Sequence, residues 1–311
     1  MPDELRLNNP WLVAVWPGMG HVAISAGYYL MAKLGMHLLA ELSAQELFDV
    51  EHVEVKDGLI HTGRIPRSRF FVWNDPRGRH DIVVFIGEAQ PPRGKYAFCL
   101  SLIEFARGLG VERVFTFAAM ATQMHPKADS RVFGAATDEE SLAELKRLEL
   151  EVLEDGHIGG LNGVVLGVAA DHGLRGACLL GEMPHIFAQF PFPKASLAVL
   201  EVFTTIADIE IDFTELSEQA RDMEQKLGEL LAQVERAYEH EQQVPTEEET
   251  VSRSPAEEER LRPEVRRRIE QLFEQAKQDR SYAYELKREL DRLNVYPEYE
   301  DRFLDLFKKS E

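Results

Sequence analysis

A glycine turn near the start of the chain is the first group of residues whose types and spacing could do chemistry. The apolar run Trp11–Trp16 leads into Pro17–His21 (PGMGH), and small and apolar residues at helical spacing follow. Backbone N–H groups in such a turn can hold an anion at the start of a helix. Gly18, Gly20 and Ala23 also fit a dinucleotide-binding pattern by letter, although the third glycine is missing. A tight structural turn is the preferred interpretation, and the alternatives are an anion site, another small-ligand site or a dinucleotide site.

Two carboxylates form the second candidate group. Glu88 and Glu182 each come directly after a glycine that ends an apolar run. If both runs are strands of one sheet, the two carboxylates share a rim and can act as general acid and base. They can equally cap helices or pair with Arg93 and Arg175.

The other reactive side chains form no recognised catalytic or metal-binding pattern. None of the ten histidines has H-E-x-x-H or H-x-H spacing, and the two cysteines are not spaced as C-x-x-C, so we expect no metal site and no cofactor. Cys99 and Cys178 lie in apolar segments, which favours buried free thiols in a reducing compartment. No G-x-S-x-G motif is present, and Ser25 and Ser196 fall inside predicted helices. We therefore assign no catalytic residue.

Charge and hydropathy narrow the class of partner. The chain has 311 residues and a formal net charge of −19, which argues against nucleic acid and anionic membranes as partners. It contains no apolar run of the length needed to span a membrane. Its first ten residues, MPDELRLNNP, lack the basic and apolar regions of a signal peptide, so a cytoplasmic location is expected.

The elements that must position these residues alternate between strand and helix over the first two thirds of the chain, which predicts a three-layer α/β/α sandwich. The candidate strands are Trp11–Trp16, Met36–Leu42, Arg69–Trp73, Asp81–Gly87, Val111–Ala118, Arg131–Ala136 and Ala177–Gly181. Asp57-Gly58 between two short β-prone runs predicts a hairpin. Ala119–Lys127 is predicted to be a loop.

The carboxyl ends of the strands in such a sheet are where ligands bind. Four glycines fall within nine residues around Gly159–Gly163, which indicates unusual backbone angles or a close approach of another backbone. We therefore expect a candidate ligand rim made of Pro17, Gly18, Met19, Gly20, His21, Glu88, Gln90, Gly160 and Asn162.

The last third of the chain changes character. We predict a sandwich domain over residues 1–238 that includes a long amphipathic helix, an acidic linker over 239–260, and a helical appendage over 261–311. The appendage has three apolar stripes, which are Val265/Ile269/Leu272/Ala276, Leu286/Leu290/Leu293 and Phe303/Leu304/Leu306/Phe307. Such helices can bind a second copy or another protein.

Several blocks, in this order, resemble the prokaryotic branch of the proteasome assembly chaperone family. They are Trp16–Gly20, Gly87–Pro91, Leu109–Val111, Gly159–Gly163, Glu182–Pro184 and the predicted helix Pro193–Ala207. The resemblance extends from about Asn9 to Leu230. It implies a sandwich similar to that of purine nucleoside phosphorylases, and self-association, for which we expect a trimer. Some members dock into proteasome rings through a hydrophobic–Tyr–any-residue tail. This chain carries Lys308–Glu311 (KKSE) at that place, so we do not expect docking by that route.

Two classes of function follow from these observations. The preferred one is a non-catalytic, self-associating protein-interaction module of the assembly-chaperone type. The alternative is a phosphorylase- or hydrolase-like enzyme or a binder of a small anion or nucleotide, using the rim. Some relatives carry the label of ATP-dependent carboxylate–amine ligase, but no glycine-rich nucleotide loop supports that activity in this sequence.

Overall fold

The computed structural model describes residues 7–48, 53–242, 263–278 and 282–293, and the single positions 295, 299, 302, 303 and 306. The chain divides into two compact units, Met1–Glu239 and His240–Glu311. The predicted acidic linker lies outside the described residues from 243 onward. Within the described residues, no helix is long and apolar enough to cross a membrane.

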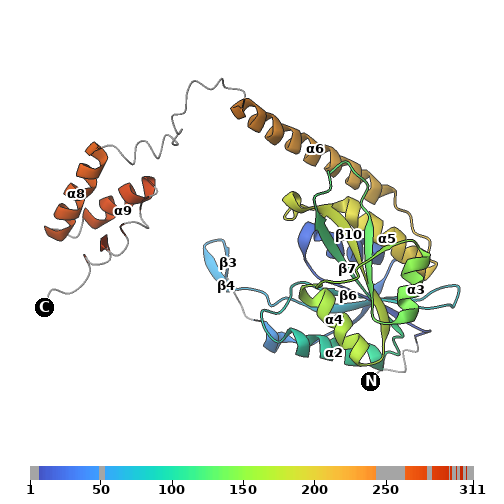
Figure 1. Ribbon diagram of the computed structural model, residues 1–311. Helices are drawn as coiled ribbons and strands as arrows, with labels where there is room; N and C mark the ends of the chain where they lie inside the picture. Colours follow the sequence, from blue (N-terminus) through green and yellow to red (C-terminus); the bar gives the residue numbers. More distant parts are fainter. Residues whose placement is uncertain are drawn as a thin grey trace. The chain divides into compact units, whose positions relative to one another are not determined.

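The first unit is built on an eight-stranded sheet with the order β2-β5-β6-β1-β7-β10-β8-β9 (Figure 1). The strands are β1 (Trp11–Val15), β2 (His37–Glu41), β5 (Ser68–Trp73), β6 (Ile82–Gly87), β7 (Arg113–Thr122), β8 (Val132–Ala136), β9 (Glu151–Val152) and β10 (Arg175–Pro184). The four central strands, β6, β1, β7 and β10, are parallel. β2 and β5 form an antiparallel edge on one side, and β8 pairs antiparallel to β10 on the other.

Helices cover both faces of this sheet, so the predicted α/β/α sandwich is confirmed. Successive residues of β1 point to opposite faces: Val13 and Val15 pack in one core, and Leu12 and Ala14 pack in the other. The first core is covered by α1 (Val22–Lys33), α3 (Glu139–Arg147), α5 (Pro193–Ala207) and α6 (Thr214–Gln242). The second is covered by α2 (Lys95–Gly108) and α4 (Gly160–Asp171), which Figure 1 shows on the face opposite α5.

The central strands are continuous apolar runs because both of their faces are buried. Every residue of β6 is buried. β7 differs from the prediction: it continues through Ala119–Thr122, which the sequence assigns to a loop. These residues stay in the strand because they pair in register with Gly181–Pro184 of β10.

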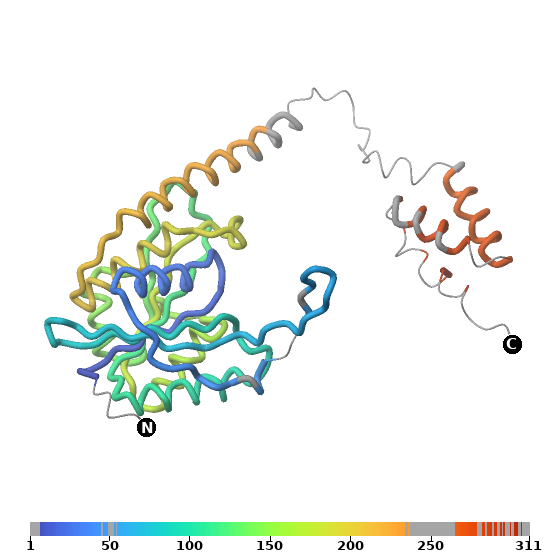
Figure 2. The backbone as a smooth tube through the Cα atoms, turned by 180° about the vertical axis from the view of Figure 1, so that it is seen from behind, coloured from blue at the N-terminus to red at the C-terminus, as the bar shows by residue number. Residues whose placement is uncertain are grey.

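A separate two-stranded sheet, β3 (Val53–Lys56) and β4 (Leu59–Thr62), forms a hairpin that Figure 2 shows extending away from the main sheet. Asp57 and Gly58 both have positive φ, at 52° and 78°, which is the signature of a type I′ turn. The predicted hairpin is therefore confirmed.

In the second unit, α8 (Pro263–Gln278) and α9 (Tyr282–Arg292) share an apolar core of their own. Ile269, Leu272 and Ala276 of the first predicted stripe and all three residues of the second are buried in it. Phe303 and Leu306 also pack against this core, whereas Leu304 and Phe307 lie outside the described residues.

Candidate functional site at the carboxyl edge of the sheet

The turn Pro17–His21 is held by the neighbouring loop before α5. The N–H of Gly20 donates to the carbonyl of Ala188 at 2.9 Å, and the N–H of Phe192 donates to the carbonyl of Gly20 at 2.9 Å. Gly20 has φ +58°, and a Cβ placed on it would stand 2.6 Å from Sδ of the buried Met183. Only glycine fits this conformation and this space. Backbone groups at Gly20 are thus used for the fold, and His21 (φ 52°) is exposed beside them.

A cavity of about 500 Å³ lies beside this turn. Five of the nine expected rim residues line it: Gly18, Met19, Gln90, Gly160 and Asn162. Its other walls come from β7, β10, α1 and the loop before α4, namely Ala23, Ala118, Ala119, Met120, Ala121, Leu153, His157, Ile158, Gly159 and Leu180. Pro17, Gly20, His21 and Glu88 do not line it. The wall from Ala119 to Ala121 was missed by sequence reasoning, which assigns those residues to a loop.

Gln90 joins the two glycine-rich segments of the rim. Its Oε1 accepts from the N–H of Leu161 at 3.2 Å, and its Nε2 donates to the carbonyl of Pro17 at 3.4 Å. One side chain therefore fixes the first turn of α4 against the turn that precedes α1.

The start of α4 explains the glycine-rich block. A Cβ on Gly163 would lie 2.1 Å from the carbonyl oxygen of Ile158, so this position accepts only glycine. No side chain caps the helix at Gly159. Asn162 is 8% exposed; its backbone carbonyl accepts from Thr116, and its Oδ1 finds no hydrogen-bond partner among the described residues. Gln90 Oε1 already pairs with the N–H of Leu161 in the first turn of α4, so what the cavity adds is the unpaired amide oxygen of Asn162.

The buried carboxylate of Glu182 is held by the half-exposed Arg131. Nε and Nη2 of Arg131 each donate to its carboxylate at 2.8 Å, and the hydroxyl of Thr122 donates at 2.7 Å. The hydrogen bonds from Arg131 lower the pKa of Glu182, against the effect of burial. Arg175, one of the two arginines that the sequence offered as alternative partners, pairs with Glu140 instead. Glu182 is thus a charged structural group, poorly suited to donate a proton.

Glu88 is held in a second clamp on the far side of β1. It accepts from Arg69 at 2.7 Å, from Arg64 at 2.9 Å and from the N–H of Arg67 at 3.0 Å. β6 and β10, which carry Glu88 and Glu182, are separated by β1 and β7, so strand spacing alone puts the carboxylates roughly 14 Å apart. The expected acid–base pair is therefore not brought together.

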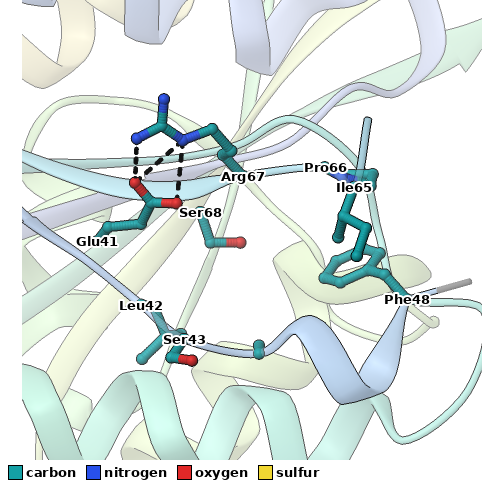
Figure 3. A pocket seen from close by; sticks show the side chains of 9 residues that line it. Glu41, Leu42, Ser43, Phe48, Ile65, Pro66, Arg67 and Ser68 are labelled. Atoms are coloured by element: carbon teal, nitrogen blue, oxygen red, sulfur yellow. Dashed lines mark hydrogen bonds and ion pairs between the residues drawn. The ribbon is translucent and has the colours of Figure 1, made fainter. Parts of the chain in front are cut away.

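A smaller pocket of about 260 Å³ lies where β2 ends and β5 begins (Figure 3). Leu42, Ala44, Phe48, Ile65 and Pro66 make its apolar walls, and Ser43 and Ser68 add hydroxyls. Glu41 and Arg67 form an ion pair at its edge. Ser68 is 3% exposed, and its Oγ has no partner in the described part of the chain. Sequence reasoning gave no signal for this pocket, because the antiparallel pairing of β2 with β5 assembles it.

Two of the histidines serve local structure through their side chains. Nδ1 of His185 lies 2.8 Å from the carbonyl of Thr122, and Nδ1 of His172 lies 2.9 Å from that of Val168. Across the described residues, no three His, Cys, Asp or Glu side chains gather as a metal site would require.

Comparison with known proteins finds solved structures that share this fold. The chain is 27% identical to PbaB of Pyrococcus furiosus, an archaeal proteasome activator; the match covers 76% of this chain and 96% of that one, with a TM-score of 0.62. The proteasome-assembly chaperone homologue Rv2125 of Mycobacterium tuberculosis shares the fold at 22% identity, with 71% and 94% of the chains covered and a TM-score of 0.62.

A sequence relative, the uncharacterized protein MJ1210 of Methanocaldococcus jannaschii, is 29% identical over 226 residues, which are 72% of this chain and 83% of that protein. The model of the PAC2 family matches residues 12–231, which span the sheet, both helical layers and the rim. The chain therefore belongs to the PAC2 family.

Proposed function

We propose that this protein is a non-catalytic interaction module that self-associates and binds a proteasome ring, as an assembly chaperone or an activator. The observation that carries the proposal is the 27% identity to an archaeal proteasome activator over 96% of that chain. PAC2 family membership over residues 12–231 supports it.

The chemistry of the rim is in keeping with a docking surface. Both rim carboxylates are committed to arginine clamps. Met19, Ile186 and Phe190 are each about half exposed, and hydrogen bonds at Gly20 join the two segments that carry them. Clustered apolar side chains on a surface mark sites where proteins bind. We infer that this cluster, the rim patch, contacts the ring.

A binding experiment with matched variants tests this proposal. The full chain and its Met19→Asp and Phe190→Asp variants are immobilised and exposed to purified proteasome core particle. Leu38→Asp is the control, because Leu38 is 55% exposed on the edge strand β2, away from the rim patch. We expect the two rim variants to weaken binding at least about tenfold and the control to bind as the wild type does. Equal binding by all four proteins would refute the role of the rim patch.

Self-association and the C-terminal helices complete the proposal. We propose a trimer, located in the cytoplasm, in which the C-terminal helices after residue 238 bind a further protein. Light scattering coupled to size exclusion measures the number of copies. Pull-downs with the intact chain and with a chain that stops after Ala237 test the helices, and identical partners in both would remove them from the proposal.

A second candidate function, small-ligand binding, is favoured by one observation. Asn162 Oδ1 has no partner among the described residues and lies beside a cavity of about 500 Å³ at the start of α4, where it can accept from a hydrogen-bond donor of a small ligand. Thermal unfolding with millimolar phosphate, nucleosides or ATP tests it, because a ligand of the native state must raise its stability. A melting temperature unchanged by all three classes would count against the cavity as their site.

A further inference from the structure

The hairpin β3–β4, residues 53–62, has an apolar face that the described part of the chain leaves exposed; we call this hairpin the arm. Its register pairs Val55 with Ile60 and Val53 with Thr62, which puts these four residues on one face. Val53, Val55 and Ile60 are 54%, 66% and 73% exposed. Leu59, at 65%, belongs to the opposite face because its neighbour Ile60 belongs to the first.

The alternation of apolar and polar residues in the arm is typical of a sheet with one buried face. Valine and polar residues alternate through Val53–Lys56, as in strands that pack one side on a core. A two-stranded hairpin is marginal in water by itself and gains independent stability when its apolar face packs on something else. The arm therefore needs a surface that can take β-branched apolar side chains.

A surface of that kind exists in the same chain, in the pocket at the base of the arm (Figure 3). Five apolar residues line its 260 Å³, which suits one or two aliphatic side chains. Figure 3 shows Ser68 Oγ directed into the space between the Glu41–Arg67 pair and Phe48 with Ile65. That hydroxyl is buried and unpaired within the described residues. Thr62, on the apolar face of the arm, brings a hydroxyl that can pair with it.

We propose that the arm of one copy lays its apolar face over this pocket in a second copy of the chain, and this rests on the self-association proposed above. The arm cannot fill its own pocket from its present position, because its apolar face is exposed and Figure 2 shows the arm extending away from the sheet. Between copies that each carry a net charge of −19, an uncharged face avoids the general repulsion.

Lys56 lies on the face of the arm opposite Val55 and Ile60, because it pairs with Leu59, and Asp57 belongs to the turn itself. The contact with the pocket is therefore made by the uncharged side chains of the apolar face. Because the arm and the pocket are different surfaces, the contact closes either as a dimer with two reciprocal arm-to-pocket contacts or, head to tail, as a ring when the rotation allows it.

Oligomer size in matched variants tests the proposal. Light scattering after size exclusion is run on the full chain and on Val55→Asp, Ile60→Asp and Leu59→Asp, with circular dichroism to confirm folding. We expect the first two variants to raise the dissociation constant at least about tenfold, since each places a carboxylate in an apolar contact. Leu59→Asp is the control, because Leu59 is as exposed as Val55 but on the other face. Equal behaviour of all three variants would overturn the proposal.

Cross-linking identifies the pocket as the acceptor. Ile60→Cys and Ser43→Cys proteins are prepared separately, mixed and oxidised; the native cysteines stay silent because both are fully buried. A disulfide between the two proteins supports the contact, since it requires Cα atoms within about 7 Å. Disulfides only between two Ile60→Cys chains would overturn it in favour of arm-to-arm packing. A monomeric wild type overturns self-association itself, whereas an oligomer untouched by Ile60→Asp overturns only the arm.

Discussion

Replacing Gly20 by alanine should destabilise the sandwich far more than the same change at Gly18, two residues earlier. Gly20 has φ +58°, a conformation that costs an L-residue about 1–2 kcal/mol. The new Cβ would stand 2.6 Å from Sδ and 2.9 Å from Cε of Met183, which is fully buried and has little room to move. Overpacking of this kind costs about 1–3 kcal/mol. The two contributions together give a loss of about 3 kcal/mol.

Gly18 provides the matched control. Its φ is −164°, which any residue adopts, and no described atom lies within 4 Å of a Cβ placed there. Gly18→Ala should therefore change the free energy of unfolding by less than about 0.5 kcal/mol. Both positions belong to the same turn, so a general sensitivity of the turn to substitution would affect both variants alike.

Urea unfolding and thermal melting measure the difference. For a domain of this size, 3 kcal/mol corresponds to a fall in melting temperature of roughly 6–12 °C. A double-mutant cycle with Met183→Ala isolates the steric part, and we expect a coupling of about 1–2 kcal/mol between the two sites. If Gly20→Ala unfolds at the same urea concentration and temperature as Gly18→Ala, or shows no coupling to position 183, the structural role assigned to Gly20 in this turn is wrong.

Three further predictions concern buried ionisable groups. Burial raises the pKa of Asp75, but hydrogen bonds from the N–H groups of Arg77 and Arg79 and from the Arg79 side chain outweigh it and hold the pKa at about 2. The ionised form is favoured in the folded state, so above pH 4 Asp75 should add about 2 kcal/mol to the free energy of unfolding, and this contribution is lost as the pH falls through 2. In urea titrations at several pH values, Asp75→Asn should remove this pH dependence. Glu182→Gln should lower the free energy of unfolding by about 1–2 kcal/mol at pH 7, because Arg131 pairs with the charged carboxylate. This loss should become smaller as the pH falls below the ordinary pKa of a glutamate. Burial raises the thiol pKa of both cysteines to about 12, so a thiol reagent at pH 8 should label the protein only after unfolding.

Much of the fold could be predicted from local patterns in the sequence. The apolar runs that became β1 and β6 identify themselves because both faces are buried, and the Asp57-Gly58 turn identifies its hairpin because few residue pairs accept two positive φ angles. The glycine-rich block Gly159–Gly163 was readable for a steric reason. Gly163 tolerates no side chain against the Ile158 carbonyl.

The remainder depends on pairings distant in sequence. The extension of β7 is set by its register with β10, and local residue preference does not reveal it. The partner of Glu182 is Arg131, 51 residues away, whereas the sequence offered Arg93 and Arg175 as possible partners of the two carboxylates. The pocket beneath Ser68 exists because β2 and β5 bring residues 41–48 and 65–68 together. No sequence pattern within a single helix or strand predicts these contacts.

The central claim is that this PAC2 protein acts by binding other proteins. Sedimentation velocity of the full chain, alone and with purified proteasome core particle, tests it most directly. The account predicts an oligomer in the absence of the core particle and co-sedimentation in its presence, weakened by Met19→Asp. A chain that sediments as a monomer and stays apart from the core particle at micromolar concentration would contradict it. If phosphate, a nucleoside or ATP then also raised its melting temperature, the small-ligand function would take its place.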